Sequence, residues 1–151
     1  MEIQMKVKNV EKHELKKLLD LYQYLFNDDA KVSENTLVDT WNIIQNNQDF
    51  FNYYTIESNN IFVSSCNIAI VPNLTRGSRP FAVIENVITH PDFRRRGLGK
   101  MVVEKAINFA KSKKCYKIML LSNSMRKEAH KFYEAIGFNG NEKIGFILKF
   151  K

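Results

Sequence analysis

A turn rich in arginine and glycine carries the strongest chemical signal in this chain of 151 residues. Its sequence is Arg94-Arg95-Arg96-Gly97-Leu98-Gly99-Lys100, and it stands between an extended apolar stretch and an amphipathic one. A turn that opens a helix leaves backbone N–H groups without partners, and these groups, together with the helix dipole, bind phosphate. Gly97 and Gly99 have no Cβ that would keep a ligand away from the backbone. The turn therefore predicts a phosphate site, although an ordinary basic loop has a similar composition.

Two other residues have side chains suited to acid–base chemistry. Glu85 lies in the apolar run Ala82-Val83-Ile84-Glu85-Asn86-Val87-Ile88-Thr89. Burying an unpaired charge in such a run costs free energy. We therefore expect Glu85 either to act in a functional site or to pair with Arg76 or Arg79 of the preceding loop. Tyr133 carries a phenol, which is protonated at neutral pH and can donate its proton. On spacing alone, however, the position of Tyr133 on an apolar stripe favours a core residue.

The net charge of +7 is unevenly distributed along the chain. Residues 91–131 carry +9, whereas residues 1–90 carry −3 and residues 132–151 carry +1. A basic segment around the turn suits a ligand with several phosphates, and an acidic segment before it suits a cationic partner. The alternative interpretation is a solvated, lysine-rich surface.

The cysteines and histidines do not suggest disulfide or metal chemistry. Cys66 and Cys115 lie in apolar, strand-like stretches, which is typical of buried thiols in a reducing compartment. No Cys/His spacing is typical of a zinc site. No apolar run is long enough to span a membrane, and the first residues lack the apolar core of a signal peptide. We therefore expect a cytoplasmic protein with no metal and no membrane contact.

The apolar periodicity predicts a single domain over residues 1–151, without repeats or linkers. Ser33 is predicted to cap a helix, and Ser58-Asn59-Asn60, between two aromatic strands, is typical of a hairpin turn. The expected elements, in chain order, are a strand at 3–10; helices at 15–26 and 34–44; strands at 50–57, 61–71 and 81–89; a helix at 98–111; a strand at 116–121; a helix at 129–136; and a closing strand at 142–150.

Two of these segments resemble motifs of one enzyme family. Arg94-x-x-Gly97-x-Gly99 is similar to the pyrophosphate-binding motif of the GNAT superfamily of acetyl-coenzyme A-dependent N-acyltransferases. The segment Ala129-His130-Lys131-Phe132-Tyr133-Glu134-Ala135-Ile136-Gly137-Phe138 resembles a second motif of that superfamily, at the expected distance. The resemblance implies the GNAT fold, of the α/β (α+β) class. This fold has a mixed central β-sheet, helices on both faces, and two parallel strands that splay apart around acyl-coenzyme A.

The resemblance also implies a role for each site residue. Tyr133 would protonate the departing thiolate, and Glu85 would accept the amine proton or hold the acceptor ammonium group. Backbone amides around Val87 would stabilise the oxyanion, while Ser124 would cap a helix or touch the coenzyme. The residues expected to bind the coenzyme are Val87, Ile88, Thr89, Arg94, Arg95, Arg96, Gly97, Leu98, Gly99, Lys100 and Ser124. Those expected to bind the acceptor are Arg76, Glu85 and Asn86.

The implied reaction moves an acetyl group from acetyl-CoA, the acyl donor, to a primary amine of a small molecule or peptide. The amine would attack directly in a ternary complex, and no residue is assigned to a metal. Dimers are common among such proteins, so a homodimer is one of the open oligomeric states. Two alternative functions are a catalytically silent acyl-CoA-binding protein and a nucleic-acid-binding module suggested by the basic segment. The second alternative lacks any recognised nucleic-acid-binding motif.

Overall fold

The computed structural model describes residues 5–151, so the start of the strand predicted at 3–10 lies outside the described residues. The chain divides into two compact units, Met1–Met119 and Leu120–Lys151, and each is described by itself. The first unit contains β1 (Val7–Asn9), η1 (Lys12–Glu14), α1 (Leu15–Tyr22), α2 (Glu34–Gln45), β2 (Phe51–Ser58), β3 (Ile61–Val71), α3 (Thr75–Ser78), β4 (Phe81–Thr89), η2 (Pro91–Phe93), α4 (Leu98–Ser112) and β5 (Ile118–Met119). The second unit contains α5 (Lys127–Ile136).

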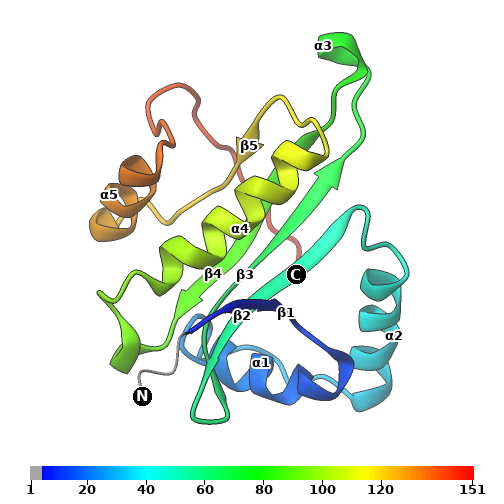
Figure 1. Ribbon diagram of the computed structural model, residues 1–151, viewed down its shortest axis with the longest axis vertical. Helices are drawn as coiled ribbons and strands as arrows, with labels where there is room; N and C mark the ends of the chain where they lie inside the picture. Colours follow the sequence, from blue (N-terminus) through cyan, green and yellow to red (C-terminus); the bar gives the residue numbers. More distant parts are fainter. Residues whose placement is uncertain (1–4) are drawn as a thin grey trace. The chain divides into compact units, whose positions relative to one another are not determined.

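A five-stranded sheet in the order β1-β2-β3-β4-β5 forms the centre of the first unit (Figure 1). Strands β1 to β4 pair antiparallel, whereas β4 and β5 pair parallel. Helix α4 joins the parallel pair, because a parallel connection must cross over the sheet. The predicted mixed sheet is confirmed. β4 matches its predicted range of 81–89, whereas β5 is much shorter than the predicted 116–121.

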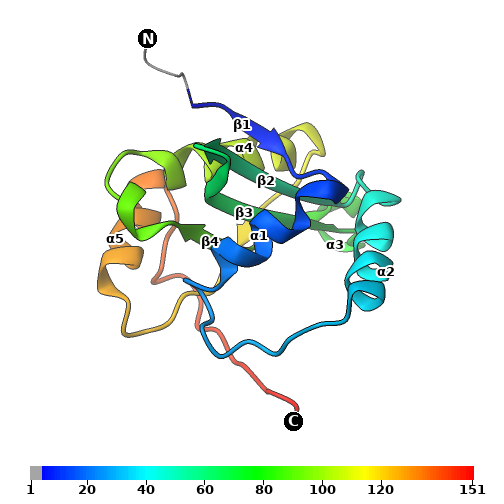
Figure 2. The same ribbon diagram turned by 90° about the horizontal axis from the view of Figure 1, so that it is seen from below.

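Helices cover both faces of this sheet (Figure 2). α4 lies over one face, where the Cys66 thiol donates to the Val102 carbonyl oxygen over 3.3 Å. α1 and α2 lie over the opposite face and pack against strand residues in a buried cluster. The members of this cluster are Val10, Leu15, Leu18, Leu21, Trp41, Phe62 and Ile88. The helical spacing of apolar residues predicts that Leu15, Leu18 and Trp41 are buried. The helix predicted at 15–26 ends earlier, at Tyr22, and Phe26 is 51% exposed.

Local signals account for the start of α2 and for the hairpin between β2 and β3. The Thr36 N–H donates to the Ser33 hydroxyl over 3.2 Å, which caps α2 as predicted. Asn59 and Asn60 adopt positive φ angles of 51° and 63° in the hairpin turn. A left-handed pair fits the twist of a two-residue hairpin, and asparagine tolerates this conformation better than most residues.

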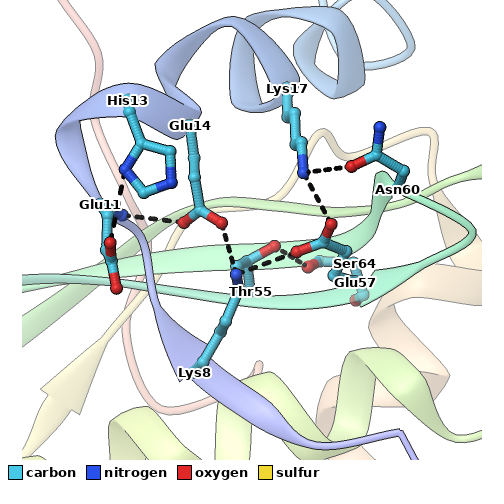
Figure 3. A network of polar contacts seen from close by, with 9 residues as sticks. All are labelled: Lys8, Glu11, His13, Glu14, Lys17, Thr55, Glu57, Asn60 and Ser64. Atoms are coloured by element: carbon cyan, nitrogen blue, oxygen red, sulfur yellow. Dashed lines mark hydrogen bonds and ion pairs between the residues drawn. The ribbon is translucent and has the colours of Figure 1, made fainter.

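A chain of ion pairs fixes α1 to the edge of the sheet (Figure 3). The ammonium group of Lys8 on β1 contacts Glu14, just before α1, and also Glu57 on β2, the latter over 2.9 Å. The Glu57 carboxylate pairs in turn with Lys17 of α1 over 2.6 Å. The side chain of Glu14 is only 5% exposed. Its charge is therefore stabilised by Lys8 and by the Glu11 N–H, 3.0 Å away, rather than by water.

The second unit consists of one amphipathic helix and irregular chain. α5 ends at Gly137, which has a φ of 117° and donates its N–H to the carbonyl oxygens of Tyr133 and Glu134. The strand predicted at 142–150 is wrong, because the residues after α5 form neither helix nor strand. Large apolar side chains of this segment are 67–92% exposed. Its apolar pattern is that of a strand, but a strand is stable only beside a partner.

The substitution Glu14→Gln tests the ion-pair chain. Glutamine keeps the shape but removes the charge that faces Lys8, so we expect the free energy of unfolding to fall by about 1–3 kcal/mol. Urea unfolding at neutral pH, followed by circular dichroism, measures this loss. The control is Asp39→Asn, which removes a negative charge from an exposed position of α2 and should change stability by at most about 0.5 kcal/mol. Equal losses in the two variants would contradict a special role for Glu14.

The same ion pairs should make the fold sensitive to acid. Burial alone would raise the pKa of Glu14, but hydrogen bonds from Lys8 and the Glu11 N–H outweigh burial and hold this pKa below its ordinary value. Hydrogen bonds from Lys17 and Lys8 lower the pKa of Glu57. Such carboxyl groups contribute stability above the ordinary pKa of about 4.3 and lose it as the pH falls through their folded values. Wild type should therefore lose more stability below about pH 4 than Glu14→Gln does.

Candidate coenzyme and acceptor site

The predicted phosphate turn is the loop between β4 and α4. Arg95 and Gly97 have positive φ angles of 61° and 76°, which bend the chain before α4 begins at Leu98. No side chain caps the first turn of α4, so the N–H groups of its first residues are left for a ligand. A Cβ at Gly97 would meet no heavy atom within 4 Å. The turn therefore offers the open N–H groups that bind a phosphate.

A series of ring contacts holds this turn in place. His90, directly after β4, accepts a hydrogen bond from the Asp92 N–H at Nδ1 over 3.2 Å. The His90 ring lies 4.6 Å from the ring of Tyr24 and 5.6 Å from that of Phe93, measured between centroids. The Arg96 guanidinium lies over the Phe93 ring at 5.0 Å. Tyr24 could not be predicted from the sequence as a support of this turn, because its partner His90 is far along the chain.

The three arginines of the turn have different surroundings. Arg94 and Arg96 donate to backbone carbonyl oxygens of β4 and η2 over 3.4 and 3.2 Å, so their guanidinium groups brace the turn. Arg95 lies at the exposed bend. Lys100 forms only a loose pair with Glu104, with 3.7 Å between nitrogen and oxygen. Arg95 and Lys100 are therefore the cations best able to approach a bound phosphate.

β4 extends well beyond its pairing with β5. The parallel ladder consists of two residue pairs, Ala82 with Ile118 and Val83 with Met119, whereas β4 continues to Thr89. From residue 84 onward, no strand within residues 5–151 pairs with this edge of β4. An unpaired edge presents N–H and C=O groups that can bind an extended ligand. β4 therefore runs six residues beyond the parallel ladder, from residue 84 to Thr89.

A β-bulge interrupts β4 beside the unpaired edge. The register with β3 shifts between Ser65 and Asn67, so that Asn86 and Val87 together face a single residue of β3. Asn86 has a φ of 52° and donates its amide N–H to Oδ1 of Asn67 over 2.9 Å. A bulge leaves one residue outside the ladder and increases the local twist. It therefore places Val87, a predicted oxyanion residue, where the ladder is broken.

Glu85 is exposed on β4. No ion pair of the described residues involves it, so the predicted pairing with Arg76 or Arg79 does not form. The Arg79 guanidinium donates instead to the carbonyl oxygens of Lys114 and Cys115 over 3.2 and 3.1 Å. Arg76 lies in α3, at the opposite end of β4 from the phosphate turn (Figure 1). Glu85 and Asn86 thus lie on β4, the strand that leads into the phosphate turn. Arg76 lies at the other end of that strand.

Tyr133, the predicted acid, lies in the second unit. It is half-buried on α5, and its ring contacts those of Phe132 and Phe138 at centroid distances of 5.1 and 6.0 Å. The helix predicted at 129–136 is confirmed, with α5 beginning two residues earlier. The catalytic role of Tyr133 stays a prediction.

Ser124 also lies in the second unit, before α5. It does not cap the helix, because the N-cap residue is Arg126 and no side chain caps the first turn. The preceding loop is ordered instead by Asn123, whose side chain accepts a hydrogen bond from the Met125 N–H over 2.9 Å. The capping role predicted for Ser124 is therefore wrong, and its contact with the coenzyme stays a prediction.

Neither cysteine is suited to act as a nucleophile. Cys66 is fully buried, and burial raises the pKa of its thiol to about 12. Burial also raises the pKa of Cys115. Because the thiolate is the reactive form, an acyl-enzyme intermediate on either residue is disfavoured. Within residues 5–151, no three His, Cys, Asp or Glu side chains gather as a metal ligand set, and no helix has the length and apolar character to cross a bilayer.

Comparison with known families agrees with this geometry. Residues 14–138 match the acetyltransferase (GNAT) family. This chain belongs to the GNAT family of acetyltransferases. The matched region includes the bulged strand, the glycine turn and α5, so the motif resemblance and the overall match identify the same family.

Individual GNAT proteins are similar over different shares of the chain. Over 81 residues the chain is 37% identical to glucosamine 6-phosphate N-acetyltransferase of Trypanosoma brucei brucei, which covers 54% of this chain and 53% of that protein. The chain thus spans about half the length of this relative. A solved structure from Agrobacterium tumefaciens strain C58, with a provisional acetyltransferase assignment, has a TM-score of 0.87 at 35% identity, covering 95% of this chain and 99% of that one. An aminoglycoside N-acetyltransferase solved in complex with CoA shares the fold, with a TM-score of 0.78 at 18% identity, covering 97% of this chain and 95% of that one.

The substitution Gly97→Asn tests whether the turn binds the coenzyme. Asparagine tolerates the left-handed conformation and its Cβ has room in the fold, so the variant should stay folded. We expect it to lose the rise in melting temperature that acetyl-CoA gives wild type, because its side chain blocks the approach of the phosphates. A ligand at a hundred times its dissociation constant adds about 2.7 kcal/mol of stability, which thermal denaturation detects readily.

Two further variants complete this experiment. Gly97→Val should also lose the ligand-induced shift and should be less stable by about 1–2 kcal/mol, since valine resists a positive φ. Gly140→Ala, which places a methyl group in open space, should keep the shift. A Gly97→Asn variant with the full wild-type shift would show that the phosphates bind elsewhere.

Proposed function

We propose that this GNAT protein transfers the acetyl group of acetyl-CoA to a primary amine by direct attack in a ternary complex. The unpaired edge of β4, which leads into the glycine turn, is the observation that carries the proposal. The edge and the turn offer backbone groups to an extended ligand that ends in a pyrophosphate, and acetyl-CoA has this form. Membership of the GNAT family supports the same donor, as does the CoA bound to the aminoglycoside N-acetyltransferase.

The reaction requires a neutral amine, a stabilised oxyanion and a protonated leaving group. The amine nitrogen attacks the thioester carbonyl carbon, the C–S bond breaks, and the coenzyme leaves as a thiol. Glu85 would take the amine proton directly or through water, since its exposed carboxylate has no cationic partner within residues 5–151. The N–H group of Val87 or of its neighbours, at the bulge, would donate to the oxyanion. Tyr133 would supply the proton that the departing thiolate needs.

Amines carried by sugars are the acceptors to assay first. One relative is named a glucosamine 6-phosphate N-acetyltransferase and another an aminoglycoside N-acetyltransferase. Both names describe an amino group on a sugar. Glu85, the exposed carboxylate on β4, would hold such an amine as its ammonium form before deprotonation.

The proposal predicts release of CoA thiol when the protein is mixed with acetyl-CoA and amines of this class. Tyr133→Phe should lower kcat by about 10- to 1,000-fold, because phenylalanine keeps the ring but loses the proton. The rise in melting temperature with acetyl-CoA should be kept. Tyr116→Phe, which removes a hydroxyl group from a residue outside the proposed site, is the control. Wild-type turnover by Tyr133→Phe would show that Tyr133 only packs, and binding of acetyl-CoA without turnover of any amine would favour a silent binder.

Glu85→Gln examines the proposed base. The variant should have a lower kcat/KM and a higher acceptor KM, with little loss of stability, because the exposed carboxylate of wild type forms no ion pair within residues 5–151. If Glu85 takes the amine proton, kcat/KM of wild type falls on the acid side of its pH profile and the variant has a flatter acid limb. Asp39→Asn, at an exposed carboxylate of α2 outside the proposed site, is the control. A Glu85→Gln variant that melts much lower but keeps its specific activity would assign Glu85 to the fold instead.

A further inference from the structure

A polar row crosses three strands on the face of the sheet that carries α1 and α2. Asn67 on β3 is the register partner of Tyr53 on β2 and of Glu85 on β4. Register partners project to the same face, with Cβ atoms about 4.5–5.5 Å apart. Cys66 contacts α4 on the opposite face, so its neighbour Asn67 faces the side of α1 and α2. Tyr53 packs against the cluster under these helices, which assigns the row to the same side.

The helical cover of this face ends at Asn67. Closer to the hairpin, Phe62 and Ser65 on β3 are 2% and 0% exposed. Asn67 is the first half-buried residue on this face of β3, although Cys66 and Ile68 beside it are buried against α4. Tyr53 lies at one end of the row. Its ring packs edge-on against the ring of Trp41, with 5.8 Å between the centroids. Asn67, which is half-buried, and its exposed register partner Glu85 therefore both keep contact with solvent.

The amide of Asn67 has a fixed orientation and spare donors. Its Oδ1 accepts the hydrogen bond from Asn86, the residue at the bulge. The N–H groups of its Nδ2 donate to no oxygen atom of residues 5–151. Glu85, directly opposite, offers only acceptor oxygens when ionised. The pair is therefore complementary to a ligand that presents an ammonium group to Glu85 and an oxygen atom to Asn67.

We propose that Asn67 is a specificity-determining residue for the acceptor, and that its amide donates to a hydroxyl oxygen on the carbon next to the acceptor amine. The acceptor class is then an amino alcohol, with amino sugars among its members, rather than a simple alkyl amine. This inference rests on the proposed acetyl transfer. An amine without the hydroxyl group leaves the Asn67 donors unpaired once water is displaced, which costs binding free energy.

Two ring amines that differ by one hydroxyl group test this inference. The probes are trans-2-aminocyclohexanol and cyclohexylamine, each assayed with acetyl-CoA by release of CoA thiol. Wild type should prefer the amino alcohol by about 10- to 100-fold in kcat/KM, the range expected for one hydrogen bond to a fixed donor. Asn67→Leu should remove most of this preference, mainly by raising KM for the amino alcohol, with little change in kcat. The rise in melting temperature with acetyl-CoA should be unchanged.

A second variant and a control distinguish the loss of the Asn67 donor from misfolding. Asn67→Asp keeps the size and can still accept the hydrogen bond from Asn86, but it offers no N–H, so it should lose the preference as well. Asn73→Leu makes the same change as Asn67→Leu in the loop at the other end of β4, and should keep the preference.

The possible failures are distinguishable. Equal use of the two probes by wild type, or an undiminished preference in folded Asn67 variants, would overturn the role of Asn67 while leaving acetyl transfer intact. Wild type that acetylates other amines but neither probe would also overturn it. Wild type that acetylates no amine at all would overturn the proposed function itself.

Discussion

The short ladder between β4 and β5 is the constraint on which the proposed site depends. β4 runs on beyond the two residue pairs that it forms with β5, and within residues 5–151 no strand pairs with the N–H and C=O groups of this edge. Burying such groups without a partner costs free energy, so an edge of this kind must stay in contact with water or bind a ligand. The bulge at Asn86 and the left-handed turn at Gly97 lie along the same stretch of chain. Together they lie between the open edge and the N-terminus of α4 along the chain, which is the path that the proposed extended ligand would follow.

The opposite requirement applies to the rest of the sheet, which must stay rigid while one edge is open. α4 covers one face. On the other, Lys8 pairs with Glu14 and Glu57, and Glu57 pairs with Lys17 of α1, which fixes this helix to the sheet. Because Glu14 is almost fully buried, its charge is compatible with folding only while Lys8 stays beside it. The contact of Tyr24 with His90 then extends the support from the end of α1 to the start of the phosphate turn. The turn is thus supported from the α1 side as well as by its own arginines.

Elements defined by local signals could be predicted from the sequence, and those defined by distant partners could not. The β4 range of 81–89 and the glycine turn follow from apolar spacing and from the special conformations that glycine allows. The segment 142–150 has the apolar pattern of a strand, but it pairs with no strand within residues 5–151, and an apolar pattern alone does not supply a partner. Glu14 looks like an ordinary charge at a helix start, and only the fold brings Lys8 to it. Asn67 was missed in the same way, because its significance comes from register with Glu85 rather than from its own neighbours.

The direction of hydrogen bonds in a sheet has a consequence for how such a protein can diverge. Backbone N–H and C=O groups point within the plane of the sheet, whereas side chains stand perpendicular to it. On β4 the donor would therefore be recognised by main-chain atoms that every residue type possesses, and the acceptor by side chains such as Glu85. In the proposed site, substitutions that alter the acceptor would leave the main-chain contacts of the donor in place. Geometry would thereby separate two recognition tasks on one strand, and the choice of acceptor would drift over generations at little cost to the use of the donor.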